Sequence, residues 1–177
     1  MRTRRDLLAA GLGVAVAARR ADPARAAREN IGQDRGLLDL LALYSGGVVY
    51  AYDQVLLHAP LEPGDRPTLR RLRADAAQND AALRRALVRK GGTPPSRAES
   101  VQVAQPPPGG RASYLRYLLQ TEEVMAAGWY QALQKFDDRG LLEGTAAQMA
   151  AGGRRLVPLR DLAGLPLLPK AFETGAS

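Results

Sequence analysis

The sequence contains no cysteine and a single histidine, and these two shortages exclude several kinds of site. Without cysteine the chain has no disulfide, no thiolate metal site and no lipid-modified cysteine after a leader, so its stability must come from packing. His58 stands at the end of a predicted helix, where a histidine interacts favourably with the helix dipole. No carboxylate lies at ligand spacing from it, so we assign it a structural role rather than a metal-binding one.

Patterns that carry catalysis are also missing. No segment shows sustained strand alternation, and no glycine-rich phosphate loop follows a strand. No Ser-His-Asp set can be built beyond the lone histidine, and no second carboxylate is placed for glycoside chemistry. The sequence therefore shows no visible enzymatic chemistry.

The excess of positive charge is concentrated at the N-terminus. The first 26 residues hold six of the 25 basic and two of the 18 acidic residues, which leaves 19 and 16 and reduces the net charge from +7 to +3. A field this small does not favour phosphate binding, so we predict no nucleic-acid partner. The arginines of the second predicted helix are expected to form its solvated face: Arg70, Arg71, Arg73, Arg84, Arg85 and Arg89.

The first 26 residues have the layout of an export signal. Arg4 and Arg5 precede an apolar run at 7–18, which is too short to span a bilayer, and Ala24 and Ala26 form a small-x-small cleavage pattern. The segment resembles a twin-arginine leader cut near Ala26, and this route exports proteins already folded. The alternative is an uncleaved amphipathic segment. We predict an exported protein, periplasmic or extracellular, whose mature part does not span the membrane.

Four blocks with helical spacing of apolar residues make up the rest of the chain, and Pro and Gly separate them. They run over 36–59, from Pro67 to the glycines at 91, over about 112–136 and over 141–162. The stripe of the first block consists of Leu38, Leu41, Ser45, Val48, Tyr52 and Val55. That of the second consists of Leu69, Leu72, Ala76, Asn79, Leu83 and Ala86. We expect Leu41, Leu83 and Leu159 to be buried together, and Pro158 to kink or end the fourth helix.

A polar connection of some 18 residues separates the second block from the third, whereas the connections inside each pair are short. This arrangement is typical of an up-down bundle with one crossover. The predicted fold class is therefore all-α, a ferritin-like up-down four-helix bundle with a long connection between helices 2 and 3. It would form one domain over 27–177.

Short segments along 37–175 carry a resemblance to a known family. They are Tyr50-Ala51-Tyr52, Asn79 to Leu83 with Gly91 to Pro95, Glu123 with Ala127 and Tyr130, Leu156 to Leu162, and Ala171 to Gly175. In this order the chain resembles the exported ferritin-like domain proteins of bacteria, which have twin-arginine leaders. Such bundles hold two iron or manganese ions with a Glu from each of two helices and a Glu-x-x-His pair from each of the others.

The resemblance places the six ligand positions on residues of which five are altered. The positions are Ser45, Ala76, Asn79, Glu123, Gly152 and Arg155. Serine, alanine and glycine cannot replace carboxylates, and an arginine brings positive charge to the place of a cation. The resemblance therefore implies that the metal site is vestigial and that the protein has no cofactor.

Glu122 and Glu123 point about 100° apart on a helix, so at most one of them faces the core. Periodicity leaves the choice open, because Glu122 completes a stripe with Leu118, Met125 and Trp129. The resemblance favours Glu123. On that basis we predict that Arg155 takes the place of the lost metal by pairing with Glu123, because arginine stays charged when buried and grips a carboxylate with two hydrogen bonds.

Two glycine pairs, Gly46-Gly47 and Gly152-Gly153, lie in predicted mid-helix positions, where each glycine costs about 1 kcal/mol relative to alanine. Close approach of helices, at the place where metal ligands once kept them apart, is the favoured explanation. The alternative is a ligand cavity lined by Tyr50, Tyr52 and Trp129.

Two functional hypotheses follow. The preferred one is a non-catalytic exported ferritin-like protein that serves as a structural or binding module of the cell envelope, with an unknown protein or small ligand as partner. The alternative is a metal-binding oxidoreductase or iron-handling protein. It would use iron or manganese in a reduced site built from Glu122, Glu123 and neighbours such as Asp75 or Asp80.

Overall fold

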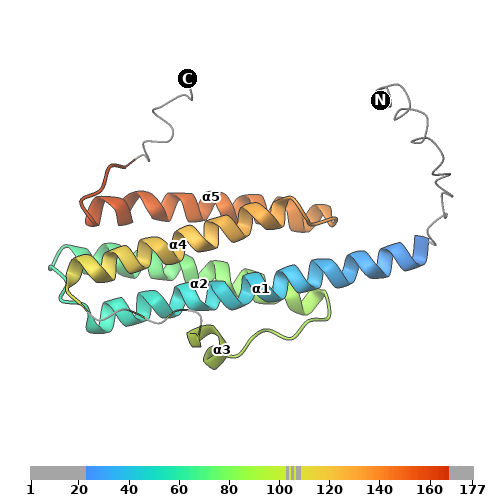
Figure 1. The fold of residues 1–177 in the computed structure, drawn as a ribbon, viewed down its shortest axis with the longest axis horizontal. Coiled ribbons are helices and arrows are strands. Elements are labelled where there is room, and N and C mark those ends of the chain that lie inside the picture. The colour runs from blue at the N-terminus through green and yellow to red at the C-terminus, as the bar shows by residue number, and fades with distance from the viewer. Residues whose placement is uncertain (1–22, 103, 105, 107–108, 168–177) are drawn as a thin grey trace, which may run out of the picture.

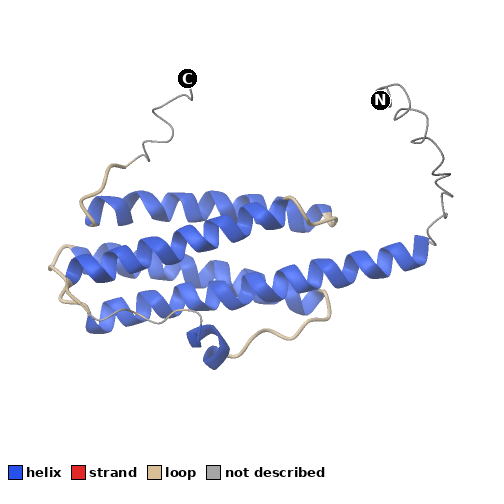
Figure 2. Ribbon diagram, viewed as in Figure 1, coloured by secondary structure: helices blue, strands red, loops and turns tan. Residues whose placement is uncertain are grey.

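A computed structural model describes residues 23–102, 104, 106 and 109–167 (Figure 1), and this part of the chain contains five helices and no strand (Figure 2). The helices are α1 (Pro23–His58), α2 (Asp65–Arg89), α3 (Arg97–Gln102), α4 (Arg111–Leu133) and α5 (Arg139–Leu162). The all-α prediction is therefore confirmed.

The four long helices lie in two neighbouring pairs. Helix α1 packs along α2 and α4, and α4 packs along α5, whereas α2 and α5 share the smallest interface among the packed pairs. In Figure 1 the α4–α5 pair lies above the α1–α2 pair, and the short α3 lies on the outer side of α1. The second pair thus rests on the first mainly through the α1–α4 contact.

The core is built from the predicted stripes. Every member of the α1 stripe is buried, and so are Leu69, Leu72, Ala76 and Leu83 of α2. Leu41, Leu83 and Leu159 belong to one core cluster, as predicted. At the end of α2 the prediction was one residue off, because Leu87 is fully buried while Ala86 is only partly buried. The cluster contains residues of all four long helices.

The predicted solvated arginine face of α2 is correct for Arg70, Arg71, Arg85 and Arg89, which are exposed. Arg73 and Arg84 are less exposed than these four residues, because each lies against a carboxylate that covers part of its side chain. Arg73 Nε is 2.9 Å from Asp53 Oδ1, and Arg84 Nε is 2.6 Å from Asp80 Oδ2. Helix α2 therefore turns most of its basic residues to solvent.

The ends of the helices follow local backbone rules. α1 ends at His58, which is exposed, just before Pro60. After α2, Gly91 adopts a φ of 74°, a left-handed conformation that favours glycine, and the next amide, that of Gly92, donates to the Leu87 carbonyl at 3.0 Å. α5 continues through Pro158 to Leu162, so this proline does not end the helix.

α1 begins at Pro23, earlier than the predicted start at 36. Its first turns project beyond the ends of the other helices (Figure 1), and Ala24 and Ala26 of the predicted cleavage pattern belong to these turns. Gln33 already makes a tertiary contact, because its side-chain amide donates to the Lys135 carbonyl at 3.1 Å. Arg4 and Arg5 of the predicted leader lie outside the described residues.

The long connection between α2 and α4 contains α3, a helix that was not predicted. Ser96 and Glu99 form a capping box at its start: the Ser96 amide donates to Glu99 Oε2 at 2.6 Å, and the Glu99 amide donates to Ser96 Oγ at 3.3 Å. Ser100 of α3 is buried. The predicted polar connection therefore contains a short helix in its middle section.

Within the described residues, one stretch of α1, Gly32–His58, is long and apolar enough to cross a membrane, with a mean hydropathy of 1.3 in its most apolar window. Half of that window is buried inside the protein. The core helix of a non-membrane protein has the same character, so the stretch does not identify a membrane segment.

The mid-helix glycines differ in what surrounds them. A Cβ on Gly46 would lie 2.8 Å from Ser100 Cβ and 3.0 Å from Arg84 Nη2, whereas a Cβ on Gly153 would meet nothing within 4 Å. Close approach thus explains Gly46, where α3 lies against α1. It does not explain Gly153, which is exposed.

We expect Gly46→Ala to destabilise the protein by about 1 to 3 kcal/mol, because the added methyl group overlaps α3. Gly153→Ala should stabilise it by up to about 1 kcal/mol, because the backbone becomes stiffer and nothing is displaced. Urea denaturation of both variants measures the two effects. Equal shifts of the same sign would contradict the assignment.

Candidate functional site

A buried polar cluster lies inside the otherwise apolar core. It consists of Tyr52 from α1, Glu122 from α4 and Arg155 from α5, none of which exposes more than 3% of its surface. Helical spacing explains how Glu122 comes to be there, since it lies on the same face of α4 as Leu118, Met125 and Trp129, which are all buried. Three helices are therefore joined at one polar point.

The geometry is that of a bidentate ion pair with an added hydroxyl group. Arg155 Nε donates to Glu122 Oε1 at 2.6 Å, and Arg155 Nη2 donates to Glu122 Oε2 at 2.9 Å. The Tyr52 hydroxyl donates to Glu122 Oε1 at 2.9 Å. Paired hydrogen bonds of this kind are stronger and more directional than a contact between point charges. The Glu122 carboxylate therefore accepts three hydrogen bonds in the core.

The ionisation of the two partners of Glu122 follows from this geometry. Burial, followed by the charge and hydrogen bond of Glu122, raises the pKa of Tyr52 well above its ordinary value. Burial acts to lower the pKa of Arg155, but the hydrogen bonds and charge of Glu122, with smaller contributions from Tyr52 and Asp75, raise it overall. Tyr52 thus remains a neutral hydrogen-bond donor and Arg155 remains a cation.

The predicted partner of Arg155 was wrong by one residue. Glu123 is exposed, and its nearest cation is Arg160, whose Nη1 lies 3.8 Å from Glu123 Oε1. Periodicity left the choice between the two glutamates open, and the structure places Glu122 in the core. Arg155 pairs with Glu122 instead of the predicted Glu123.

The other positions that the sequence singled out lie on the inner faces of their helices. Ser45 and Ala76 are buried in α1 and α2, and Gly152 is buried one turn before Arg155 in α5. A Cβ on Gly152 would lie 3.8 Å from Arg155 Nη2, which is ordinary contact. Asn79 is partly buried, although its Nδ2 is fully covered. Five of the six positions thus face the interior, and Glu123 does not.

Tyr52 is the member of the cluster that sequence analysis missed. It was predicted as part of the apolar stripe of α1 and, in the alternative, as part of a cavity lining, and its hydroxyl group was given no partner. A buried tyrosine hydroxyl normally finds a hydrogen-bond partner, so the stripe carried a signal for a polar group opposite. The signal does not say which residue that group belongs to.

The carboxylates proposed for a reduced metal site are dispersed. Asp75 is exposed and Asp80 pairs with Arg84, whereas Glu122 and Glu123 lie on different faces of α4. No group of three or more His, Cys, Asp or Glu side chains among the described residues is arranged to hold a metal ion.

The cavity predicted from the aromatic residues differs from those found. A small cavity is lined by Trp129 together with Leu38, Leu83 and Leu141, but neither Tyr50 nor Tyr52 lines it. Tyr52 is fully buried in the core, where it contacts Glu122 instead. The cavity lies where α5 faces α2, because the residues lining it include members of both helices.

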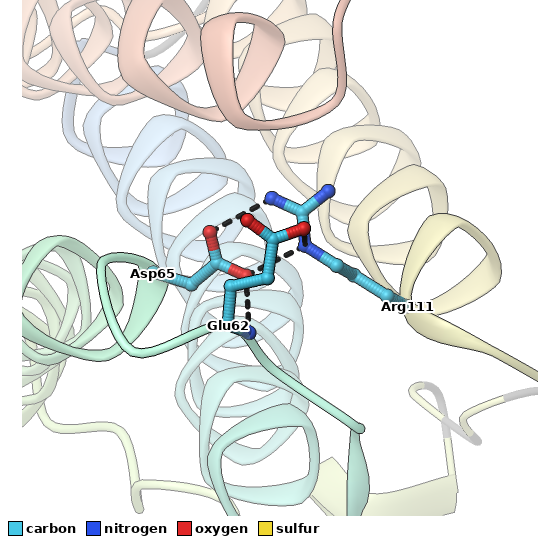
Figure 3. Close-up of polar contacts among 3 residues, drawn as sticks. All are labelled: Glu62, Asp65 and Arg111. Atoms are coloured by element: carbon cyan, nitrogen blue, oxygen red, sulfur yellow. Dashed lines mark hydrogen bonds and ion pairs between the residues drawn. The ribbon is translucent and has the colours of Figure 1, made fainter.

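A second ion-pair cluster joins the start of α4 to the start of α2 (Figure 3). Arg111 Nε donates to Asp65 Oδ2 at 2.7 Å and Arg111 Nη2 donates to Asp65 Oδ1 at 2.8 Å. Glu62 lies beside them, with its amide donating to Asp65 Oδ2 at 3.0 Å. Asp65 is buried, and the hydrogen bonds from Arg111 hold the pKa of its carboxyl group below the ordinary value.

Compared with known proteins, the sequence matches no protein-family model, and no curated protein is similar to it at a meaningful level. The site is therefore interpreted from its own chemistry.

Removing one partner of the buried pair should cost far more than removing both. We expect Arg155→Leu and Glu122→Leu each to destabilise the fold by about 3 to 5 kcal/mol, because each leaves a buried charge without its partner. The double variant should lose about 1 to 3 kcal/mol, because only the Tyr52 hydroxyl then lacks an acceptor.

Guanidinium chloride denaturation of the double-mutant cycle measures these differences. The matched control is Glu123→Leu, one residue away on the exposed face, which should change stability by less than about 0.5 kcal/mol. Single variants that each cost under about 1 kcal/mol would instead indicate a solvated pair.

The Asp65–Arg111 pair should make stability depend on acid pH. Because the pKa of Asp65 is lower in the folded protein, its contribution is present above the unfolded value of about 3.9 and is lost as the pH falls through the folded value. Asp65→Asn should cost about 2 kcal/mol at neutral pH and flatten the fall in stability below about pH 4. The exposed Asp39→Asn is the control, and an equally steep fall in Asp65→Asn would contradict the assignment.

Proposed function

We propose that this chain is a non-catalytic ferritin-like protein, exported by the twin-arginine route, which serves as a structural or binding module of the cell envelope. In this proposal the ancestral metal site has been replaced by the Glu122–Arg155 ion pair. The mature domain would extend from about residue 27 to the C-terminus.

The order and connections of the helices support the ferritin-like part of the proposal. Two pairs of long helices, α1–α2 and α4–α5, each have a short connection, and the long connection falls between α2 and α4. A ferritin-like bundle with one crossover needs this distribution. α3 is an insertion in the crossover and does not alter the order of the long helices.

The single observation that carries the proposal is the chemistry of the buried pair. A carboxylate-bridged centre needs several free carboxylates and imidazoles converging on two cations. Here Glu122 accepts three hydrogen bonds from Arg155 and Tyr52, and the guanidinium group supplies a fixed positive charge beside it. These residues do not fit two divalent metals, because another cation next to Arg155 would be repelled.

The N-terminal features support export. Arg4 and Arg5 precede a short apolar run, and the small-x-small pattern at Ala24 and Ala26 lies on the turns of α1 that project beyond the other helices (Figure 1). Removal of these turns would leave the packed section of α1, where Gln33 and Asp34 contact the α4–α5 connection, in place. A folded protein with an accessible leader is the kind of cargo that this route carries.

Export of the whole chain in a bacterial host with an intact twin-arginine pathway tests the proposal. We expect a periplasmic product with a new N-terminus near residue 27, and loss of that product when Arg4 and Arg5 are both changed to lysine. The general secretory route does not require the arginine pair, so unchanged export of the lysine variant would contradict the assignment.

Metal analysis of the same purified product provides the second test. We expect less than about 0.1 equivalent of iron or manganese per chain after growth with either metal in excess, because the donor set is incomplete. Stoichiometric metal that disappears in Glu122→Gln would support an iron-handling or oxidoreductase role instead.

A further inference from the structure

Two cavities follow one another along the facing sides of α2 and α5, the helices that share the smallest interface. The first has a volume of about 400 Å³ and includes Asn79 and Arg155 in its lining. The second, of about 150 Å³, is lined by Trp129 and Gln148. Gln148 lies two helical turns before Arg155, about 10 Å along α5.

Two residues that line the first cavity each have a buried nitrogen donor without a hydrogen-bond partner. Arg155 Nη1 and Asn79 Nδ2 are covered from solvent and have no hydrogen-bond partner among the described residues. The other two nitrogens of the Arg155 guanidinium group, Nε and Nη2, donate to Glu122, and only 3% of the residue is exposed. Buried donors normally have a partner, and leaving one without costs about 1 to 3 kcal/mol. A ligand that supplied hydrogen-bond acceptors to both donors would therefore bind favourably in this cavity.

The second cavity is mainly apolar. Leu38, Leu83 and Leu141 line it with Trp129, and its α5 wall contains Gly144, where a Cβ would meet nothing within 4 Å. Leu72, Ala151 and Pro158 also give the first cavity apolar walls. A ligand that uses both cavities therefore needs an acceptor group at one end and an apolar body.

We propose that the α2–α5 groove binds an aliphatic monocarboxylate, with the carboxylate at Arg155 and Asn79 and the chain running along α5 towards Trp129. This inference rests on the proposed function, because it gives a ligand class to the binding module. Two donors from two helices match the two oxygens of a carboxylate.

The charges around the groove favour one negative charge over two. Glu122 already balances the charge of Arg155, and the first cavity is also lined by Asp75, Arg71 and Arg154. The rim of the first cavity and the cluster together carry one net positive charge, and Arg89 lies in the lining of the second cavity. Around the two donors the balance therefore suits a monoanion better than a dianionic phosphate.

Access requires a side-chain movement, because each donor nitrogen exposes less than 1 Å². Arg71, Asp75 and Arg154 on the rim of the groove are all exposed. Exposed side chains change rotamer in picoseconds to nanoseconds, so a ligand reaches the donors when a rim residue turns aside.

Titration of the full chain with sodium octanoate at constant ionic strength tests the inference. Trp129 is the only tryptophan, so its fluorescence reports directly on the apolar cavity. We expect saturable emission changes, together with a shift of the Asn79 side-chain amide in ¹⁵N–¹H spectra. From acetate to butyrate to octanoate, affinity should rise by up to about fourfold per methylene group.

Two variants separate the ends of the groove, and both leave the Glu122–Arg155 pair intact. Asn79→Leu keeps the shape but removes a donor, so octanoate should bind about tenfold more weakly, whereas octanol should be unaffected. Gly144→Leu fills the apolar cavity and should weaken octanoate but leave acetate unchanged. Glu123→Gln, on the exposed side of α4, is the control and should match the wild type.

Three results would overturn the inference. Absence of saturation with octanoate would mean that the groove holds water only. If phosphate bound as tightly as octanoate, the proposed preference for a carboxylate with an aliphatic chain would be wrong. If octanol bound as tightly as octanoate, the two donors would have no role in binding. None of these results alters export or metal content, so failure of the ligand is distinguishable from failure of the proposed function.

Discussion

The three hydrogen bonds accepted by Glu122 are the constraint on which the packing of this protein depends. A buried carboxylate costs several kcal/mol unless it is paired, so α1, α4 and α5 can associate only in the register that brings Tyr52 and Arg155 to it. Apolar side chains around the cluster tolerate small shifts along a helix, whereas a bidentate pair does not. The cluster thus sets the axial positions of three helices.

Periodicity in the sequence predicted most of the helical framework. The whole predicted stripe of α1 and most of that of α2 are buried, because a helix that packs on one side must place its apolar residues three or four positions apart. Two features were missed for different reasons. The capping box at Ser96 and Glu99 was readable but lay inside a segment dominated by proline and glycine, and the early start of α1 lay within the predicted leader.

The polar site was only half readable. The predicted pair was Glu123 and Arg155, whereas Arg155 pairs with Glu122, which differs from Glu123 only by one position around the helix. Periodicity left the choice open, since the stripe through Met125 and Trp129 allowed Glu122, and the family resemblance favoured the wrong residue. The Asp65–Arg111 pair left no signal, because its residues are 46 positions apart and belong to no local pattern. Long-range pairs of this kind depend on the complete tertiary arrangement.

The separation of the partners along the chain bears on the order of folding. Glu122 and Arg155 are 33 residues apart, within the α4–α5 hairpin, whereas Tyr52 and Glu122 are 70 apart, across the long connection. Contacts between nearby segments close smaller loops and cost less entropy, so the charge pair can form before the two hairpins meet. The hairpins then dock without an unpaired ion at their interface. Docking of the hairpins then has to bury only the neutral hydroxyl group of Tyr52, and removing a hydroxyl group from water costs far less free energy than removing a carboxylate.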